Sequence, residues 1–306
     1  MTTVAYLGPE GTFTHAAALA WPGTTPVALP TVQDVYRAVE EGRVDRGVVA
    51  IENTVEGYVV PSLDALLASQ DVVGIDEAVL EIAFDAFVRP GATDLTEVCA
   101  HPHGLAQCQG FVARTGLAPV PAASNAAACR DATPHQVALG PRLCGELYGL
   151  ETYERDVQDF AGARTQFLLL ARRSDARAAL AAAEHTAPGA RWRTMVAVTP
   201  VVAGPGVLAR ILAAFGTGGL NLSSLITRPL KVAGRYVFVL TVDAAPVDPA
   251  LRAVFQGLLD DGHLLKTLAA FPERADRAEV LDLEHVPSGS VDGTAATADV
   301  ARELLW

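Results

Sequence analysis

The chain has 306 residues, of which 50% are hydrophobic and 19% are charged. This length favours two or more domains, and the hydrophobic content suffices for packed cores, which excludes general disorder. The formal net charge is −12, and the absence of basic runs in the sequence argues against a nucleic-acid or anionic-membrane surface.

The N-terminal segment and the cysteines predict a cytoplasmic protein. Residues 1–11 lack the basic segment followed by an apolar one that marks a secretory signal, and no apolar stretch is long enough to span a bilayer. The four cysteines form no C-x-x-C pair, so we interpret them as buried side chains in a reducing compartment. The histidines His101 and His103 flank a proline, and no metal site is predicted.

The first part of the chain alternates between strand and helix patterns, which is typical of a mostly parallel α/β layer. Pro61 is expected in the first turn of a helix, with Ser62 or Thr54 as capping candidates. In chain order the expected elements are a strand over 3–7, helices over 14–20 and 32–42, a strand over 47–53 and a helix over 61–69.

A second, similar α/β unit is expected to begin near residue 78. An apolar strand over 166–173 then follows, and we expect it to cross back to the first unit, as in two-lobed α/β proteins. The elements expected between them are strands over 96–101 and 135–140, a short strand ending at Pro121, and helices over 104–116, 124–132 and 140–149.

An alanine-rich segment, residues 174–190, is interpreted as a partly helical connector. Beyond it the order β-α-β-β-α-β predicts a ferredoxin-like domain. Its expected elements are strands over 194–200, 220–230, 234–244 and 263–272, with helices within 204–219 and 248–262. The tail after Pro272 is rich in charge and small residues, so we expect a weakly packed extension.

Four segments place polar groups or glycines between a strand and a helix, where α/β sheets bind ligands. Each also has a structural explanation, because such residues form turns and helix caps. The segments are GPEGTFTH (8–15), AIENTVEGYVVPSLD (50–64), HPHGLAQC (101–108) and ASNAAACRD (123–131). A fifth candidate is Thr165, a hydroxyl at the start of a buried strand, where threonine is also simply a good strand residue.

In this order and spacing, the motifs resemble those of prephenate dehydratases. GPEGTF, IENTVEG, HPHGLAQC, SNAAA and the ARTQF segment carry the resemblance, and GPGVL with ITRP resembles the regulatory ACT domain of that family. The resemblance implies an α/β catalytic domain with two lobes, like a periplasmic binding protein, followed by a ferredoxin-like (βαββαβ) ACT domain. The implied boundaries are catalytic domain 1–173, connector 174–192, ACT domain 193–273 and C-terminal extension 274–306.

The resemblance also implies roles for residues. Thr165 matches the threonine that the family uses as a catalytic group, and no cofactor or metal is expected. The implied substrate-binding residues are Gly11, Thr12, Phe13, Glu52, Asn53, Thr54, Ser124, Asn125, Gln166 and Phe167. The implied L-phenylalanine effector site comprises Gly206, Val207, Leu208, Asn221, Leu222, Arg228 and Pro229. The expected partners are prephenate and that effector, in a homodimer or homotetramer.

The sequence departs from the family motifs at two places. The family's Thr-Arg-Phe is Thr165-Gln166-Phe167 here, and its Glu-Ser-Arg-Pro is Ile226-Thr227-Arg228-Pro229. Loss of an arginine that contacted substrate would remove a charge-assisted hydrogen bond. The second departure removes a carboxylate from the effector site.

Three functions therefore compete. The leading one is a hydro-lyase, prephenate dehydratase, which makes phenylpyruvate for phenylalanine synthesis. The alternatives are a prephenate decarboxylase that does not aromatise the ring and a non-catalytic sensor that binds an amino acid or prephenate. Retention of Thr165, whose role is water loss, favours the dehydratase.

Overall fold

The computed structural model describes residues 1–186, 189–274, 286–288, 290–291, 294–295 and 297–305. The chain divides into two compact units, Met1–Arg274 and Ala275–Trp306, and helix α11 (Thr297–Leu304) belongs to the second. Throughout the described residues, the helices are too short or too polar to cross a membrane.

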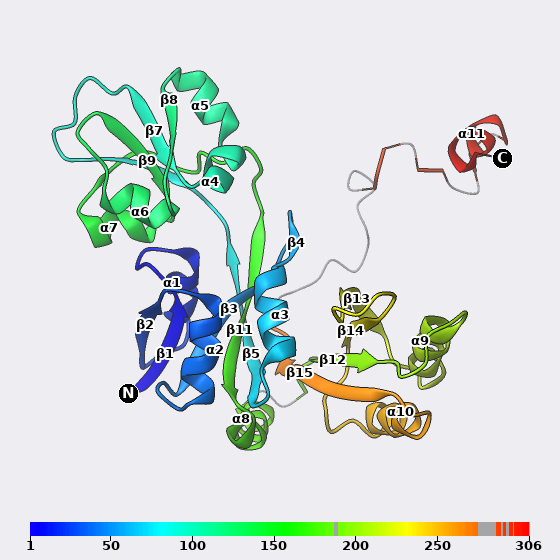
Figure 1. Ribbon diagram of the computed structural model, residues 1–306. Coiled ribbons are helices and arrows are strands. Elements are labelled where there is room, and N and C mark those ends of the chain that lie inside the picture. Colours follow the sequence, from blue (N-terminus) through cyan, green and yellow to red (C-terminus); the bar gives the residue numbers. More distant parts are fainter. Residues whose placement is uncertain (187–188, 275–285, 289, 292–293, 296, 306) are drawn as a thin grey trace. The chain divides into compact units, whose positions relative to one another are not determined.

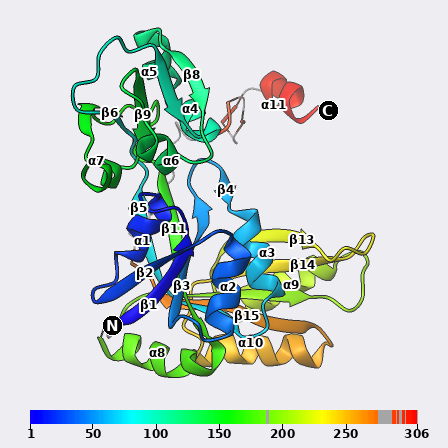
Figure 2. The ribbon, with the colours of Figure 1, turned by 60° about the vertical axis from the view of Figure 1, so that its left-hand side comes forward.

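Among its described residues the first unit has two sheets and ten helices. Figures 1 and 2 show how they are arranged. The larger sheet contains β1 (Thr2–Leu7), β2 (Thr24–Leu29), β3 (Arg46–Asn53), β4 (Gly57–Tyr58), β5 (Val72–Glu81), β11 (Arg164–Arg172), β12 (Trp192–Thr199), β13 (Leu222–Pro229), β14 (Tyr236–Val242) and β15 (Leu264–Pro272). The smaller sheet contains β6 (Asp85–Val88), β7 (Glu97–Ala100), β8 (Ala118–Pro121), β9 (Gln136–Gly140) and β10 (Glu151–Glu154). The helices are α1 (Phe13–Ala18), α2 (Val32–Glu40), α3 (Val60–Ala68), α4 (Pro102–Gln107), α5 (Gln109–Thr115), α6 (Asn125–Arg130), α7 (Leu143–Tyr148), α8 (Arg173–Thr186), α9 (Val207–Thr217) and α10 (Pro249–Asp260).

The first lobe contains strands β1 to β5 and the returning strand β11. The order β5-β11-β3-β1-β2 places β11 between β5 and β3, antiparallel to both, which confirms the predicted return to the first lobe. Helices α1 and α8 cover the face that carries Phe167, and helices α2 and α3 cover the face that carries Leu168. The apolar run of β11 is thus buried on both faces, as expected for a central strand.

The second lobe begins later than expected. Residues 78–81 still belong to β5, because this strand pairs with β11 as far as Glu81 opposite Arg164. The chain enters the second sheet only at β6 and leaves it after β10, so two segments connect the lobes (Figure 1). The order β10-β6-β9-β7-β8 gives this lobe a core of its own around Phe111 and Leu139.

The C-terminal part of the first unit shows the predicted order β12-α9-β13-β14-α10-β15. Helices α9 and α10 cover one face of its sheet, around Val198 and Phe215, while Ala197 and Val239 on the other face join the core beneath α3. A parallel bridge between Ala269 of β15 and Gly74 of β5 makes this sheet continuous with that of the first lobe.

Gly74 permits this junction, since a Cβ atom there would lie 2.7 Å from the Cβ of Ala269. Gly74→Ala should therefore lower the free energy of unfolding by about 1–3 kcal/mol, as overpacking does. Urea denaturation measures the effect. The matched control is Gly257→Ala on α10, where a Cβ meets nothing within 4 Å and alanine should stabilise the helix by about 0.5–1 kcal/mol. Equal stability of Gly74→Ala and the parent would contradict the close junction.

Several local expectations need correction. Strands β2, β4, β5, β6 and β10 were not among the predicted elements. Strand β2 is an edge strand that contains Pro26, and both β2 and β10 are partly exposed, so their hydrophobic pattern is weak. Helix α3 carries Pro61 in its first turn as expected, but it begins after Val59 without a side-chain cap, and Ser62 is buried within the helix. All four cysteines are buried free thiols, which confirms their interpretation as small core residues.

Candidate active site

Thr165 lies near the start of β11 with only 7% of its surface exposed. Its neighbours across the sheet are Asn53 of β3 and Leu80 of β5. The Nδ2 atom of Asn53 donates a hydrogen bond to the Thr165 Oγ1 atom at a distance of 2.8 Å. Because a primary amide nitrogen can only donate, the threonine oxygen accepts, and its own proton is available for another acceptor.

The orientation of the Asn53 amide is fixed by its own backbone turn. Its Oδ1 atom accepts hydrogen bonds from the N–H groups of Val55 and Glu56, at 2.8 and 3.1 Å. The amide oxygen is therefore committed to the turn, and the NH2 group must face Thr165. The threonine hydroxyl is thereby left as a donor, with its oxygen already occupied by the asparagine.

A bulge in β3 brings Asn53 to the correct face. The pairing with β11 shifts register, so that Gln166 pairs with Glu52 and Phe167 pairs with Ala50, leaving Ile51 as an extra residue. The extra residue reverses the side-chain alternation beyond it. Asn53 consequently lies on the same face as Thr165.

The other predicted residues of β3 and β11 have different surroundings. The Thr54 Oγ1 atom accepts from the Arg164 N–H at 2.9 Å, and the Thr54 N–H donates to the Arg164 carbonyl at 2.9 Å. Phe167 is a core residue, with 1% of its surface exposed. Gln166 and Glu52 pair across the sheet on the face opposite Thr165. Thr165 and Asn53 therefore lie together on one face of the sheet, and Gln166 and Glu52 lie on the opposite face.

A cavity of about 640 Å³ lies between the two lobes. Four of the predicted substrate-binding residues line it: Thr12, Phe13, Ser124 and Asn125. A neighbouring cavity of about 610 Å³ shares Phe13 and contains Leu80, the β5 neighbour of Thr165. Phe13 thus lies between the two cavities, and Thr165 lines neither of them directly.

The loop before α1 is fastened to both lobes. Gly11 has φ +83°, and its N–H donates to the Nδ1 atom of His15 at 3.1 Å. From α7, Cys144 Sγ donates to the Gly11 carbonyl at 3.2 Å and the Tyr148 hydroxyl donates to the Glu10 carbonyl at 2.6 Å. A Cβ at position 11 would lie 3.0 Å from the Cys144 Sγ, so glycine fits both the conformation and the space.

His15 is expected to make the hydrogen bond from the Gly11 N–H depend on pH. Burial lowers the pKa of the imidazole below its ordinary value of 6.5, and the nearby Glu10 carboxylate opposes this only in part. The ring stacks on Tyr6 with centroids 4.8 Å apart, and its Nδ1 accepts a hydrogen bond only while unprotonated.

A loss of stability below neutral pH is therefore expected. The contribution of neutral His15 is fully present above the unfolded-state value of 6.5 and is lost as the pH falls through that value toward the lower folded-state pKa. Urea denaturation at about pH 7.5 and about pH 5.5 measures the change. In the control His15→Asn, which keeps an acceptor near Nδ1 but does not titrate, the pH dependence should be smaller. An identical pH dependence in the two proteins would count against this role.

In the second lobe, Ser124 and Asn125 organise the start of α6. The Ser124 Oγ caps the helix by accepting from the Ala127 N–H at 2.9 Å. The Asn125 Oδ1 accepts from the His101 N–H at 2.8 Å. His101 in turn caps α4 by accepting, through Nδ1, from the His103 N–H at 3.2 Å. Both the capping and the cavity-lining interpretations of these residues therefore apply.

Arg130 also lines the cavity between the lobes, although it was not predicted as a site residue. It lies at the end of α6, and its guanidinium contacts Asp131 at 2.7 and 2.8 Å. The motif SNAAACRD contains it, and the helical spacing from Ala126 would have placed it near the same surface. It brings a guanidinium, paired with Asp131, to a cavity whose predicted lining residues are all neutral.

Three of the predicted effector residues line two separate cavities. Val207 lines a cavity of about 480 Å³ together with Arg210, Asp261 and His263. Arg228 and Pro229 line another cavity, of about 470 Å³, against α3. There the Arg228 guanidinium forms a bidentate pair with Asp64, both contacts being 2.7 Å.

The remaining effector residues lie near the ends of α9 and at β13. Gly206 precedes α9 with φ +79°, and Leu208 lies in its first turn. Asn221 donates to Asp243 at 2.6 Å, and Leu222 begins β13.

A family model, curated relatives and a solved structure agree on one family. The model of a family described as prephenate dehydratase matches residues 4–175. A prephenate dehydratase of Mycolicibacterium smegmatis is 34% identical over 318 residues, covering 95% of this chain and 99% of that protein. The structure of a prephenate dehydratase from Arthrobacter aurescens in complex with L-Phe is 30% identical, with a TM-score of 0.75, and covers 89% of this chain and 90% of that one. A structure described as GqqA, a novel type of quorum quenching acylase, is 26% identical, with a TM-score of 0.77 and coverage of 89% and 98%.

Proposed function

The chain belongs to the prephenate dehydratase family, and from that premise we propose how its residues convert prephenate to phenylpyruvate, carbon dioxide and water. Prephenate carries a ring carboxylate and, across the ring, a hydroxyl group. Breakage of the bond to the carboxylate releases CO2, and its electron pair completes the aromatic ring as the hydroxyl departs. Since hydroxide is a poor leaving group, the enzyme must supply a proton or a strong hydrogen bond to it.

Thr165 is the proposed donor to that departing hydroxyl. The observation that carries the proposal is the 2.8 Å hydrogen bond from Asn53, which occupies the Thr165 oxygen as acceptor and leaves its proton for the substrate. Burial of the threonine adds to the effect, because hydrogen bonds are stronger where water is excluded.

The cavity between the lobes is the proposed place for the dianion. Arg130 lines this cavity, and although its guanidinium also contacts Asp131, it would give a substrate carboxylate a charge-assisted hydrogen bond, which is among the stronger kinds. Thr12, Phe13, Ser124 and Asn125 form the neutral walls. In this proposal, closure of the lobes brings the substrate hydroxyl from the cavity to Thr165.

Covalent catalysis by Thr165 is not supported. A threonine nucleophile needs a base that removes its proton. The described partner of its oxygen is the Asn53 NH2 group, which donates and cannot act as that base. This geometry suits hydrogen-bond donation to a leaving group better than the acyl transfer of an acylase.

The unit β12–β15 is the proposed ACT domain, with L-phenylalanine as its effector. The supporting observations are the βαββαβ order and the mixed apolar and charged lining of the cavity beside Val207. Arg228, the retained arginine of the altered motif, is paired with Asp64, and effector binding there would have to displace that carboxylate.

Assembly into a homodimer or homotetramer is also proposed. Strand β13 lies at the edge of its sheet, and Leu225 on it is 42% exposed, so a second copy could extend the sheet there. The free thiols of all four cysteines are consistent with a cytoplasmic setting.

The test of the function is product identification. The purified protein is incubated with prephenate, with and without L-phenylalanine, and the product is identified by mass and ultraviolet absorbance against a blank for spontaneous breakdown. Phenylpyruvate at catalytic rates is expected. A dihydro product that has lost CO2 but kept its hydroxyl would favour the decarboxylase, and binding without turnover would favour the sensor.

A further inference from the structure

Thr165 and Gln166 are neighbours on β11, but their side chains lie on opposite faces of the sheet and have different partners. Thr165 faces Asn53 on one side of the sheet, and Gln166 points to the other side with Leu168. On that side the Gln166 Nε2 atom donates a hydrogen bond to the Oε2 atom of Glu77 at a distance of 2.5 Å. Gln166, the residue next to the proposed catalytic Thr165, is therefore hydrogen-bonded to the Glu77 carboxylate on the opposite face of the sheet.

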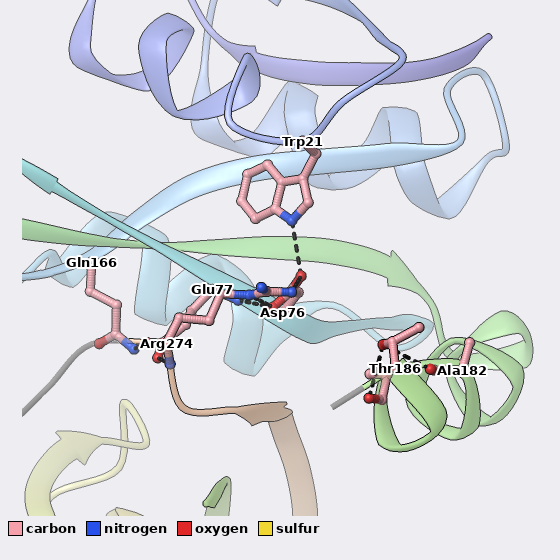
Figure 3. A network of polar contacts seen from close by, with 8 residues as sticks. Trp21, Asp76, Glu77, Gln166, Ala182, Thr186 and Arg274 are labelled. Carbon is pink, nitrogen blue, oxygen red and sulfur yellow. Dashed lines mark hydrogen bonds and ion pairs between the residues drawn. The ribbon is translucent and has the colours of Figure 1, made fainter. Parts of the chain in front are cut away.

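Glu77 is a carboxylate with 1% of its surface exposed. Its second oxygen, Oε1, accepts from the backbone N–H of Arg274 at 2.7 Å (Figure 3). Burial of a carboxylate is costly unless its oxygens are hydrogen-bonded, and here each oxygen has a donor. One carboxylate thus joins the start of β11 to the chain just beyond β15.

Arg274 is itself held in place. Its guanidinium contacts both oxygens of Asp76, at 2.6 and 2.7 Å, and the Trp21 Nε1 atom donates to the same carboxylate at 2.9 Å (Figure 3). Neighbouring carboxylates of β5 therefore hold Arg274 by its side chain and by its backbone. The Glu77 carboxylate cannot move without disturbing this whole group.

We propose that Gln166 and Glu77 are positioning residues: their hydrogen bond fixes the start of β11 and so the position of Thr165 relative to the substrate. Arg274, at the end of the β12–β15 unit, completes this group of three residues, which is called the clamp below. This proposal rests on the function proposed above for Thr165. A displacement of the donor by a fraction of an ångström weakens its hydrogen bond in the transition state, so loss of the clamp lowers kcat more than it raises KM.

The clamp also explains why glutamine is acceptable at a position where the family motif has arginine. The partner is a carboxylate that only requires a donor, and both side chains provide one. An arginine at position 166 would form a charge-assisted bond with Glu77. Gln166 thus acts through the strand, from the face that does not carry Thr165.

The decisive variant is Gln166→Met, which keeps the length of the side chain and removes the donor. We expect kcat to fall about 10-fold with KM changed less than about 2-fold, as for a lost transition-state interaction. Gln166→Arg should keep kcat within about 3-fold of the parent, because it restores a donor to Glu77. The matched control is Gln256→Met, which removes a similar amide-to-carboxylate bond (2.8 Å, to Asp260) on the exposed face of α10 and should change neither constant.

A readout that does not depend on turnover separates this proposal from the proposed function. Amide hydrogen exchange of the peptide over residues 163–170 should be faster in Gln166→Met and unchanged in Gln256→Met. Parent-like kcat and exchange in Gln166→Met would overturn the clamp, and a raised KM at unchanged kcat would make Gln166 a substrate ligand instead. If the parent does not turn over prephenate, the function fails while the exchange rates still decide the clamp.

Discussion

Replacing Thr165 by valine is expected to lower kcat by roughly 100-fold, as loss of one preorganised donor does in other enzymes, with little change in KM. Valine has nearly the same shape, so the strand should be retained, and only the hydroxyl group disappears. Steady-state kinetics with prephenate measure the effect. The reason is that the leaving hydroxyl then departs without the hydrogen bond that stabilises its developing charge.

The control is Thr165→Ser, which keeps the hydroxyl and its bond from Asn53. This variant should keep most of the activity. Unfolding in urea should show that all the variants are folded under assay conditions. Near-parental turnover of Thr165→Val would mean that the threonine is simply a strand residue, and the site would have to be sought elsewhere in the cavity.

Asn53→Asp is expected to lower kcat by roughly as much, about 100-fold, although the side chain keeps its size. The new carboxylate can still accept from the Val55 and Glu56 N–H groups. Toward Thr165, however, an acceptor replaces a donor. The threonine hydroxyl would then donate to the new carboxylate and would no longer be available to the substrate.

Two features of this experiment test the direction of the hydrogen bond. In the double variant with Thr165→Val the losses should be far from additive, because both changes remove the same donor. Lowering the pH should reduce the difference in kcat between Asn53→Asp and the parent, because a protonated carboxyl group can again donate to the threonine. Additive losses of kcat in the double variant, together with a difference in kcat that does not change with pH, would show that Asn53 acts in some other way.

The sequence allowed much of the fold to be predicted. Apolar runs with short polar ends identified β3 and β11, and β11 returned to the first lobe as expected. The contact between Asn53 and Thr165 joins residues 112 positions apart in the chain. It depends on the extra residue at Ile51, and no periodicity reveals a bulge of one residue inside an apolar strand.

Other parts of the site could be only partly predicted. Gln166 was expected to bind substrate, and the sequence left open whether its side chain faces the cleft; in the structure it lies on the face of the strand opposite Thr165. Its partner Glu77 could not be predicted, because a buried carboxylate depends on donors from distant segments such as Arg274. Arg130 was missed for a similar reason, since a basic residue at a helix end has no local sign of the cavity that it lines.

The parallel bridge between Gly74 and Ala269 has a mechanical consequence. The β12–β15 unit shares its hydrogen-bonded sheet with the first lobe, so a displacement of β15 would act directly on β5. The second lobe has a separate sheet, which is joined to the first lobe by two chain segments and by the contacts of α7 with Gly11 and Glu10. A single change at Gly74 would therefore act on the connection between the β12–β15 unit and β5, and would leave the two segments that lead into the second lobe unchanged.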